Sequence, residues 1–416
     1  MSQPDLIICG GGIAGLTAAL CAHHSGLSAV VYERSEILSE VGAGLQLGAN
    51  AMKVLDRLGL AEVCRTAGHV PASLDLREGR TGDLIFSVSA GATGRKRWGQ
   101  YHVNIQRPAL QQILAKALDE RSPGALRLGR ETVGYTETET GVDVALSDGT
   151  AVAAPALIAA DGIHSTLRKT IIGEKKPDYT GHTALRAVVP ASPSLKGILP
   201  DASTAWTGPE RHAVTYFLKD RSLINFVGVI ERPEPAPEGW HNTASLEDAQ
   251  TIFADFADPV RKVLETATEA RRWGLYDRPA MDSLASGRMA MIGDAAMPMP
   301  PFMAQGASFA IECAWAAISS FARSGHFALM NDTLPKRGAR ILATARRNGD
   351  LFHERGLPTL AKYAPVKAAA RMAPGFIRGR FDWIYGFDVT RSHPIIPVKS
   401  GEEDRRHHPD RISDET

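Results

Sequence analysis

The first 33 residues constrain the fold most strongly, because they combine a buried strand, a glycine-rich turn and a helix. Residues 5–9 (DLIIC) are apolar after Asp5, as in a strand covered on both faces, and they run into the sequence Gly10-Gly11-Gly12-Ile13-Ala14-Gly15. This spacing fits G-x-G-x-x-G, and the residues that follow predict a helix to about His24. Gly10 permits a tight turn, Gly12 lets the backbone approach a pyrophosphate, and Gly15 lets the helix pack closely on the strand.

A second strand at residues 28–32 completes this unit and ends at Glu33. An acidic side chain at this place can bind the two hydroxyls of an adenosine ribose. Strand, glycines, helix, second strand and acid therefore predict a dinucleotide-binding unit. The motif does not separate FAD from NAD.

Residues 288–313 predict another strand end that faces a ligand. An apolar run at 289–292 ends at Gly293-Asp294, where a carboxylate can accept hydrogen bonds from a ribitol or a ribose. A proline-rich loop follows, and then a long apolar helix from about residue 304 to 321. Its slim first turn, which contains Gly306, Ala307 and Ser308, leaves room for a flat ring. The alternative is a buried strand, a proline loop and a core helix without a ligand.

Three further segments have two possible functions each. The strand at 156–160 runs into Asp161-Gly162, where Asp161 either fixes its own turn or touches a cofactor. Arg107 begins a helix and either reaches a cofactor phosphate or lies on the surface. The glycine-rich loop at 41–47 precedes a helix and either borders a flat ring or forms an ordinary turn.

The middle of the chain predicts a second sheet. A hairpin is expected at residues 74–86, and four strands are expected between 182 and 231. Residues two apart on a strand share a face, so His212, Val214 and Tyr216 line one side together. A histidine beside a phenol suggests a polar pocket, since histidine titrates near neutral pH. The alternative is an edge histidine and a half-buried tyrosine without a chemical role.

Composition narrows the range of partners. A length of 416 residues predicts two domains and a C-terminal extension, in which the last residues, 400–416, are charged and disordered. Forty-seven basic and 46 acidic side chains give no field that recruits nucleic acid or an anionic membrane. The four cysteines show no metal spacing, so we expect reduced core residues and no metal site. No apolar run approaches the roughly 18 residues of a membrane helix, which predicts a soluble, cytoplasmic protein.

Taken together, the three glycine-and-acid strand ends resemble the class A flavoprotein monooxygenases. The resemblance covers about residues 4–390, and the segments 41–60 and 301–307 are most similar to the salicylate hydroxylase-like and 6-hydroxynicotinate 3-monooxygenase-like branch. It implies an α/β fold: a Rossmann-like, three-layer FAD-binding domain with a parallel sheet, a second mixed β-sheet for substrate, and C-terminal helices. We expect the FAD-binding domain at 1–73, 100–175 and 280–350, the substrate domain at 74–99 and 176–279, and the C-terminal helical extension and flexible tail at 351–416.

The resemblance also implies cofactors, a reaction and a site. NADH or NADPH reduces FAD, O2 forms a flavin C4a-hydroperoxide, and a small hydroxylated aromatic or N-heteroaromatic acid is hydroxylated by a monomer or homodimer. His212 is the expected catalytic base, assisted by Tyr216. Alternatives are a flavin-dependent halogenase, another FAD oxidoreductase, or a flavin-binding protein without catalysis. The expected cofactor-binding residues are Gly10, Gly12, Ile13, Ala14, Gly15, Glu33, Arg34, Gly44, Leu45, Arg107, Asp161, Asp294, Pro301, Gly306, Ala307 and Ser308.

Overall fold

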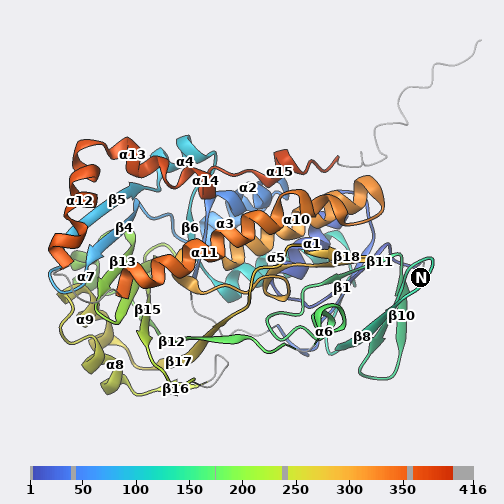
Figure 1. Ribbon diagram of the computed structural model, residues 1–416, viewed down its shortest axis with the longest axis horizontal. Helices are drawn as coiled ribbons and strands as arrows, with labels where there is room; N and C mark the ends of the chain where they lie inside the picture. Colours follow the sequence, from blue (N-terminus) through green and yellow to red (C-terminus); the bar gives the residue numbers. More distant parts are fainter. Residues whose placement is uncertain (1–2, 39–43, 174, 237–241, 354–358, 397–416) are drawn as a thin grey trace, which may run out of the picture.

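A computed structural model describes residues 3–38, 44–173, 175–236, 242–353 and 359–396. Its two largest sheets lie toward opposite ends of the molecule, and the long helices α10 (Gly306–Ser324) and α11 (Leu334–His353) run across it (Figure 1). This arrangement matches the predicted α/β class with a second sheet. The predicted tail at 400–416 lies outside the described residues.

The first sheet has six strands in the order β18-β19-β11-β1-β2-β7. Its inner strands are parallel, because β1 pairs in parallel with both β11 and β2, and β11 pairs in parallel with β19. The carboxyl ends of β1, β11 and β19 therefore meet at one edge. The strand bounds are β1 Leu6–Cys9, β2 Ala29–Tyr32, β7 Leu126–Arg127, β11 Ala156–Ala159, β18 Ala285–Ser286 and β19 Met289–Met291.

Two of these connections depend on glycine. Gly10 has φ +109°, and a Cβ there would lie 2.4 Å from the carbonyl oxygen of Ala160 at the end of β11. A Cβ on Gly15 would lie 1.9 Å from the carbonyl oxygen of Gly10, so only glycine lets α1 (Ile13–His24) approach β1. The helix then packs against α5 (Arg107–Arg121) and α10. The roles predicted for Gly10 and Gly15 are confirmed.

The second large sheet has eight strands in the order β16-β17-β12-β15-β14-β13-β4-β5. They come from two separate parts of the chain, because β4 pairs in parallel with β13. The bounds are β4 Ser73–Glu78, β5 Leu84–Ser89, β12 Asp178–Pro190, β13 Ala202–Gly208, β14 Arg211–Leu218, β15 Leu223–Glu231, β16 Thr243–Ala244 and β17 Ala270–Asp277. The predicted domain boundaries stay a prediction.

The eight-stranded sheet has two different faces. One face packs against short helices and forms an apolar core that includes Phe217, Phe226 and Phe253. The covering helices are α7 Pro193–Ile198, α8 Leu246–Ile252 and α9 Asp258–Thr266. The other face meets the 3-10 turn η2 (Pro301–Met303) and α11, and polar side chains interrupt it.

Smaller elements complete the fold. The additional helices are α2 Ala49–Arg57, α3 Ala61–Ala67, α4 Ala92–Trp98, α6 Thr166–Ile172, α12 Thr359–Met372, α13 Pro374–Gly379, α14 Asp382–Tyr385 and α15 Val389–Ser392, with the 3-10 turns η1 Gly293–Ala295 and η3 Ala328–Asp332. Three strands, β8 Thr132–Glu137, β9 Val142–Leu146 and β10 Ala151–Ala154, form a sheet of their own beside α6. The four cysteines are free and buried, as predicted, and no described helix is long and apolar enough to cross a membrane.

One sequence interpretation was wrong, and a second holds except at one residue. The described part of the glycine-rich loop is a strand, β3 (Gly44–Leu47), which pairs antiparallel with β6 (Val103–Gln106). Residues 41–43 lie outside the described chain. The basic sequence at 335–349 predicts a solvated helix face, and its basic residues are indeed exposed except Arg337, which is buried in an ion pair with Glu312 of α10.

Candidate active site

The carboxyl edge of the six-stranded sheet carries a cleft. Its volume is about 270 Å³, and Gly10, Gly12, Glu33, Arg107 and Asp161 contribute to its walls. Arg34 lines the same cleft. Residues from the ends of β1, β2 and β11 and from the start of α5 thus meet at one place, whereas Asp294 after β19 does not line this cleft.

Glu33 is fixed at the end of β2 by the glycine turn. Its Oε2 accepts a hydrogen bond from the Gly11 backbone at 2.6 Å, and its Oε1 accepts one from the Ser35 backbone at 3.0 Å. The same turn is held from α5, since the side-chain amide of Gln111 donates to the Gly11 carbonyl at 2.9 Å. Sequence analysis missed Gln111, although it lies one helical turn after Arg107.

Arg107 lies between two acids. Burial lowers the pKa of its guanidinium, while the charges of Asp294 and Glu33 act in the opposite direction. Only groups that lie near each other interact in this way, so the fold brings these three predicted residues together. Asp294 is solvent-exposed although both its chain neighbours are buried, and burial nevertheless raises the pKa of its carboxyl. The Asp294 side chain is thus accessible to solvent but largely surrounded by protein, as expected for a residue that lines a cavity.

Asp161 performs the structural role considered for it. Its Oδ2 accepts hydrogen bonds from the backbone of Thr166 at 2.9 Å and of Leu167 at 3.3 Å, at the start of α6. Burial raises the pKa of this carboxyl. Asp161 also lines the cleft. Its contacts with the start of α6 use only Oδ2, so Asp161 can also contact a cofactor.

The segment from Pro301 to Ser308 forms the start of α10. A 3-10 turn covers Pro301–Met303, and the helix begins at Gly306, slightly later than predicted. A Cβ on Gly306 would meet no heavy atom within 4 Å, so this first turn borders open space, and Ala307 is half-buried beside it. The Ser308 hydroxyl accepts a hydrogen bond from the Gly48 backbone at 3.1 Å, which ties α10 to the end of β3.

The small β3-β6 sheet touches the eight-stranded sheet at Gly44. A Cβ on Gly44 would lie 2.8 Å from the ring of Tyr216, and the Gly44 backbone donates to Asn225 Oδ1 at 2.9 Å. Leu45, the next residue of β3, is half-buried. Tyr216 and Asn225 are cross-strand partners on β14 and β15. Tyr216 therefore lies at the border between the predicted cofactor and substrate regions.

His212 is in a buried cluster rather than at a sheet edge. Its Nδ1 lies 2.6 Å from Nε2 of His353, the last residue of α11, and its ring packs against Phe302 and Phe352. Burial, together with the charges of His353 and His182, places the pKa of His212 well below its usual value. His182, Glu231 and His353 also have potential ligand atoms within 4.8 Å of one another. The expectation of no metal site stays a prediction.

Arg186 was missed from the sequence. Register places Arg186 of β12 opposite Val227 of β15, and Val227 opposite Val214 of β14, so the arginine shares a face with His212 and Tyr216. Its guanidinium lies 4.6 Å above the ring of Trp273. Burial lowers its pKa to about 10, and Tyr216 is near enough to act on it. The available signal was a lone arginine in an apolar strand.

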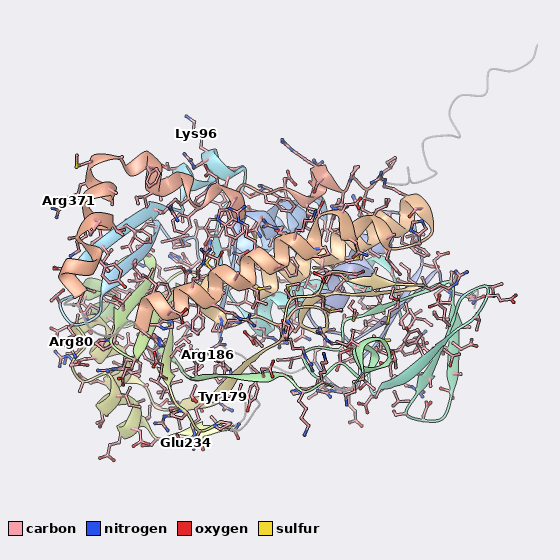
Figure 2. All side chains as sticks on the ribbon, in the orientation of Figure 1. Arg80, Lys96, Tyr179, Arg186, Glu234 and Arg371 are labelled. Carbon is pink, nitrogen blue, oxygen red and sulfur yellow. The ribbon has the colours of Figure 1, made fainter. Side chains whose placement is uncertain are left out.

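Arg186 is half-buried, whereas Arg80, Lys96 and Arg371 are exposed. Figure 2 shows Arg186 well within the outline of the molecule and the other three at its margin. A charged side chain on a partly buried sheet face costs solvation energy, so it usually has a structural or functional role.

The residues present fit a flavin adenine dinucleotide. Gly12 and Gly306 border open space, so they leave room for a diphosphate and for a flat ring. Among the described residues, Gln111 Oε1, Gln305 Nε2 and Asn225 Nδ2 are buried without a hydrogen-bond partner. Such atoms are rare in folded proteins, and ligand groups satisfy them. The Glu33 carboxylate can accept hydrogen bonds from the ribose hydroxyls, and the Arg107 guanidinium can donate hydrogen bonds to a phosphate.

Comparisons with known proteins agree with this geometry. A family model described as FAD binding domain matches residues 3–324. A 3-amino-4-hydroxybenzoate 2-monooxygenase of Streptomyces platensis is 33% identical over 393 residues, which cover 93% of this chain and 97% of the relative. The chain belongs to the FAD-dependent aromatic hydroxylases. A second hydroxylase, 3-hydroxybenzoate 6-hydroxylase 1 of Aquipseudomonas alcaligenes, is 30% identical and covers 94% of this chain and 99% of its own.

Solved structures share the fold of this hydroxylase. A salicylate hydroxylase substrate complex has a TM-score of 0.79 at 24% identity, with 96% of this chain and 99% of that chain covered. The enzyme is therefore a flavoprotein monooxygenase with FAD as its cofactor and the salicylate hydroxylase-like fold.

Proposed function

We propose that this hydroxylase acts on a small aromatic acid that carries a ring hydroxyl, with NAD(P)H and O2 as co-substrates. The observation that carries the proposal is the polar face of the eight-stranded sheet, where Arg186, His212 and Tyr216 point to the same side. The cation can bind the carboxylate of a hydroxylated aromatic acid. The neutral imidazole and the phenol on the same face can bind its ring hydroxyl. The names of the similar hydroxybenzoate enzymes support the same substrate class.

Arg186 binds the substrate carboxylate. A guanidinium donates two parallel hydrogen bonds to a carboxylate, which fixes the plane of the ring as well as its distance. Trp273 already holds the guanidinium plane, so little freedom is lost on binding. Apolar neighbours Val214 and Val227 on the same face contact the ring.

The protein residues then hold and activate the ring. When bound, FAD accepts a hydride from NAD(P)H and activates dioxygen for transfer of one oxygen atom. Glu33, Arg107 and Asp294 bind the cofactor, and Gly44 and Gly306 border its flat ring. Tyr216 orients the substrate hydroxyl, and His212 accepts its proton, which makes the ring a better nucleophile. The close packing of Phe302 against His212 keeps water away from this base.

The test is a substrate screen with the purified enzyme. Hydroxybenzoates, aminohydroxybenzoates and hydroxypyridine carboxylates are each added with NADH and with NADPH, and oxygen uptake is followed with product mass. The proposal predicts at least one acid that accelerates NAD(P)H oxidation and gains one oxygen atom. Hydroxylation of neutral phenols alone, with no acid accepted, would contradict the substrate class.

A further inference from the structure

Three polar side chains form a line that leads from the predicted base toward the surface. His212 Nδ1 lies 2.6 Å from His353 Nε2, and His353 Nδ1 lies 3.3 Å from Glu231 Oε1. The two histidines are 1% and 2% exposed, whereas the side chain of Glu231 is 32% exposed. The His353–Glu231 contact is not a well-aligned hydrogen bond, but Nδ1 has no better acceptor among the described residues.

Hydrogen-bond chemistry decides which nitrogen carries each proton. An ionised carboxylate only accepts, so the Glu231 side of His353 favours a hydrogen on Nδ1. A neutral His353 then has its lone pair on Nε2, where it accepts from His212 Nδ1. A neutral His212 with hydrogen on Nδ1 has its own lone pair on Nε2. Burial supports two neutral rings, because it lowers the pKa of His353 to about 3 and the pKa of His212 well below 6.5.

We propose that Glu231 and His353 are positioning residues that hold His212 as the tautomer whose Nε2 accepts the substrate proton. The proposal rests on the proposed role of His212 as the base. His182 also lies beside Glu231 and His353, with its ring 5.2 Å from that of His353 and its Nδ1 3.3 Å from the Thr180 hydroxyl, but His353 is the histidine that reaches His212. Phe302 packs edge-on against both His212 and His353 and restricts rotation of the rings.

The same three side chains can transfer the substrate proton from the active site to solvent. When the substrate O–H bond breaks, an N–H bond forms on His212 Nε2. The hydrogen on His212 Nδ1 passes to His353 Nε2, and the hydrogen on His353 Nδ1 passes to the Glu231 carboxylate. Both buried imidazoles are then neutral again. A charged imidazolium would cost solvation energy in this apolar environment. Glu231 is partly exposed and releases the proton to solvent.

The test changes Glu231 to Gln, because an amide of the same shape can donate to His353 Nδ1. Donation by the amide reverses both tautomers and places a hydrogen on His212 Nε2, and if its Oε1 accepts instead, the neutral amide still cannot take up the proton, so the transfer away from His212 stops. Residues that orient a metal-bound histidine are worth roughly 10- to 100-fold in activity, and we expect a loss of similar size here. We expect that decrease in kcat for Glu231→Gln with KM and FAD content unchanged, and a larger share of NAD(P)H consumption that appears as hydrogen peroxide. His353→Gln gives the same pattern, and the exposed Glu234→Gln matches wild type.

A double variant separates this proposal from its premise. In a His212→Ala background, Glu231→Gln has no further effect if it acts through His212. An equal loss in both backgrounds, or wild-type kcat for Glu231→Gln beside an impaired His212→Ala, overturns the positioning role alone. Coupled turnover at the wild-type rate by His212→Ala overturns the base instead.

Discussion

Replacement of Arg186 by Met tests how the enzyme recognises its substrate. Met is shorter than Arg, but it keeps an unbranched side chain that can pack on Trp273 and removes the charge that the substrate carboxylate requires. With a pKa of about 10, Arg186 is almost fully charged at pH 7.5, so the wild-type interaction has its full strength. A hydrogen bond between charged groups contributes about 1.5 to 3 kcal/mol, and about 1.4 kcal/mol corresponds to a factor of ten.

Arg186→Met therefore raises KM for a hydroxylated aromatic acid by roughly 10- to 150-fold. The assay compares that acid with the phenol that lacks only the carboxylate, under saturating NAD(P)H and air. Wild type prefers the acid by a similar factor, and the variant loses that preference. Arg272→Met is the matched control, because Arg272 lies on the same sheet opposite Leu185 of the other face. If the variant still prefers the acid as strongly as wild type, Arg186 does not bind the carboxylate.

The remaining predictions concern the cofactor, the core and pH. Asp294→Ala weakens FAD binding by about tenfold or more, because a cofactor hydroxyl loses a charged acceptor. The control Asp282→Ala changes an exposed aspartate and retains full flavin, as measured by absorbance. Glu312→Gln lowers the free energy of unfolding by about 3 kcal/mol or more, because it leaves a buried guanidinium without its carboxylate, and Glu62→Gln on the surface has no measurable effect in urea titrations. Stability falls below pH 6.5, because burial lowers the folded-state pKa of five described histidines, among them His102, His212 and His353, and the unfolded chain then binds more protons. The contribution of these neutral histidines to the free energy of unfolding is fully present above the unfolded pKa of about 6.5. Below that pH, each histidine lowers the free energy of unfolding by about 1.4 kcal/mol per pH unit. A pH-independent unfolding midpoint between pH 5 and 7.5 would contradict this for His102, His212 and His353.

The sequence predicted the cofactor side of the site because that side depends on local patterns. Gly10 and Gly15 must be glycine for reasons confined to one turn, and Glu33 and Asp294 follow strands that their own residues define. The order of three strand ends along the chain is sufficient to bring them to one edge, since parallel strands share their direction. This part of the fold therefore required no knowledge of long-range packing.

The substrate side depends on contacts between distant segments. His353 lies 141 residues after His212, and only the path of α11 across the molecule brings the two rings together (Figure 1). Asn225 faces Tyr216 through a register that no sequence pattern fixes. The strand Gly44–Leu47 was interpreted as a loop because it is short, rich in glycine and paired with a segment more than 50 residues away. The burial of Arg337 could not be predicted because its partner, Glu312, lies on a different helix.

Turnover under 18O2 tests the central claim most directly, namely that one site joins a bound FAD to the polar face of the second sheet. The purified enzyme receives NAD(P)H and an accepted hydroxylated aromatic acid, and the product is analysed by mass spectrometry. The account predicts one 18O atom in each product molecule and one NAD(P)H consumed for each hydroxylation. Oxygen that derives from water, or NAD(P)H consumption that yields only hydrogen peroxide with every acid tested, would contradict it.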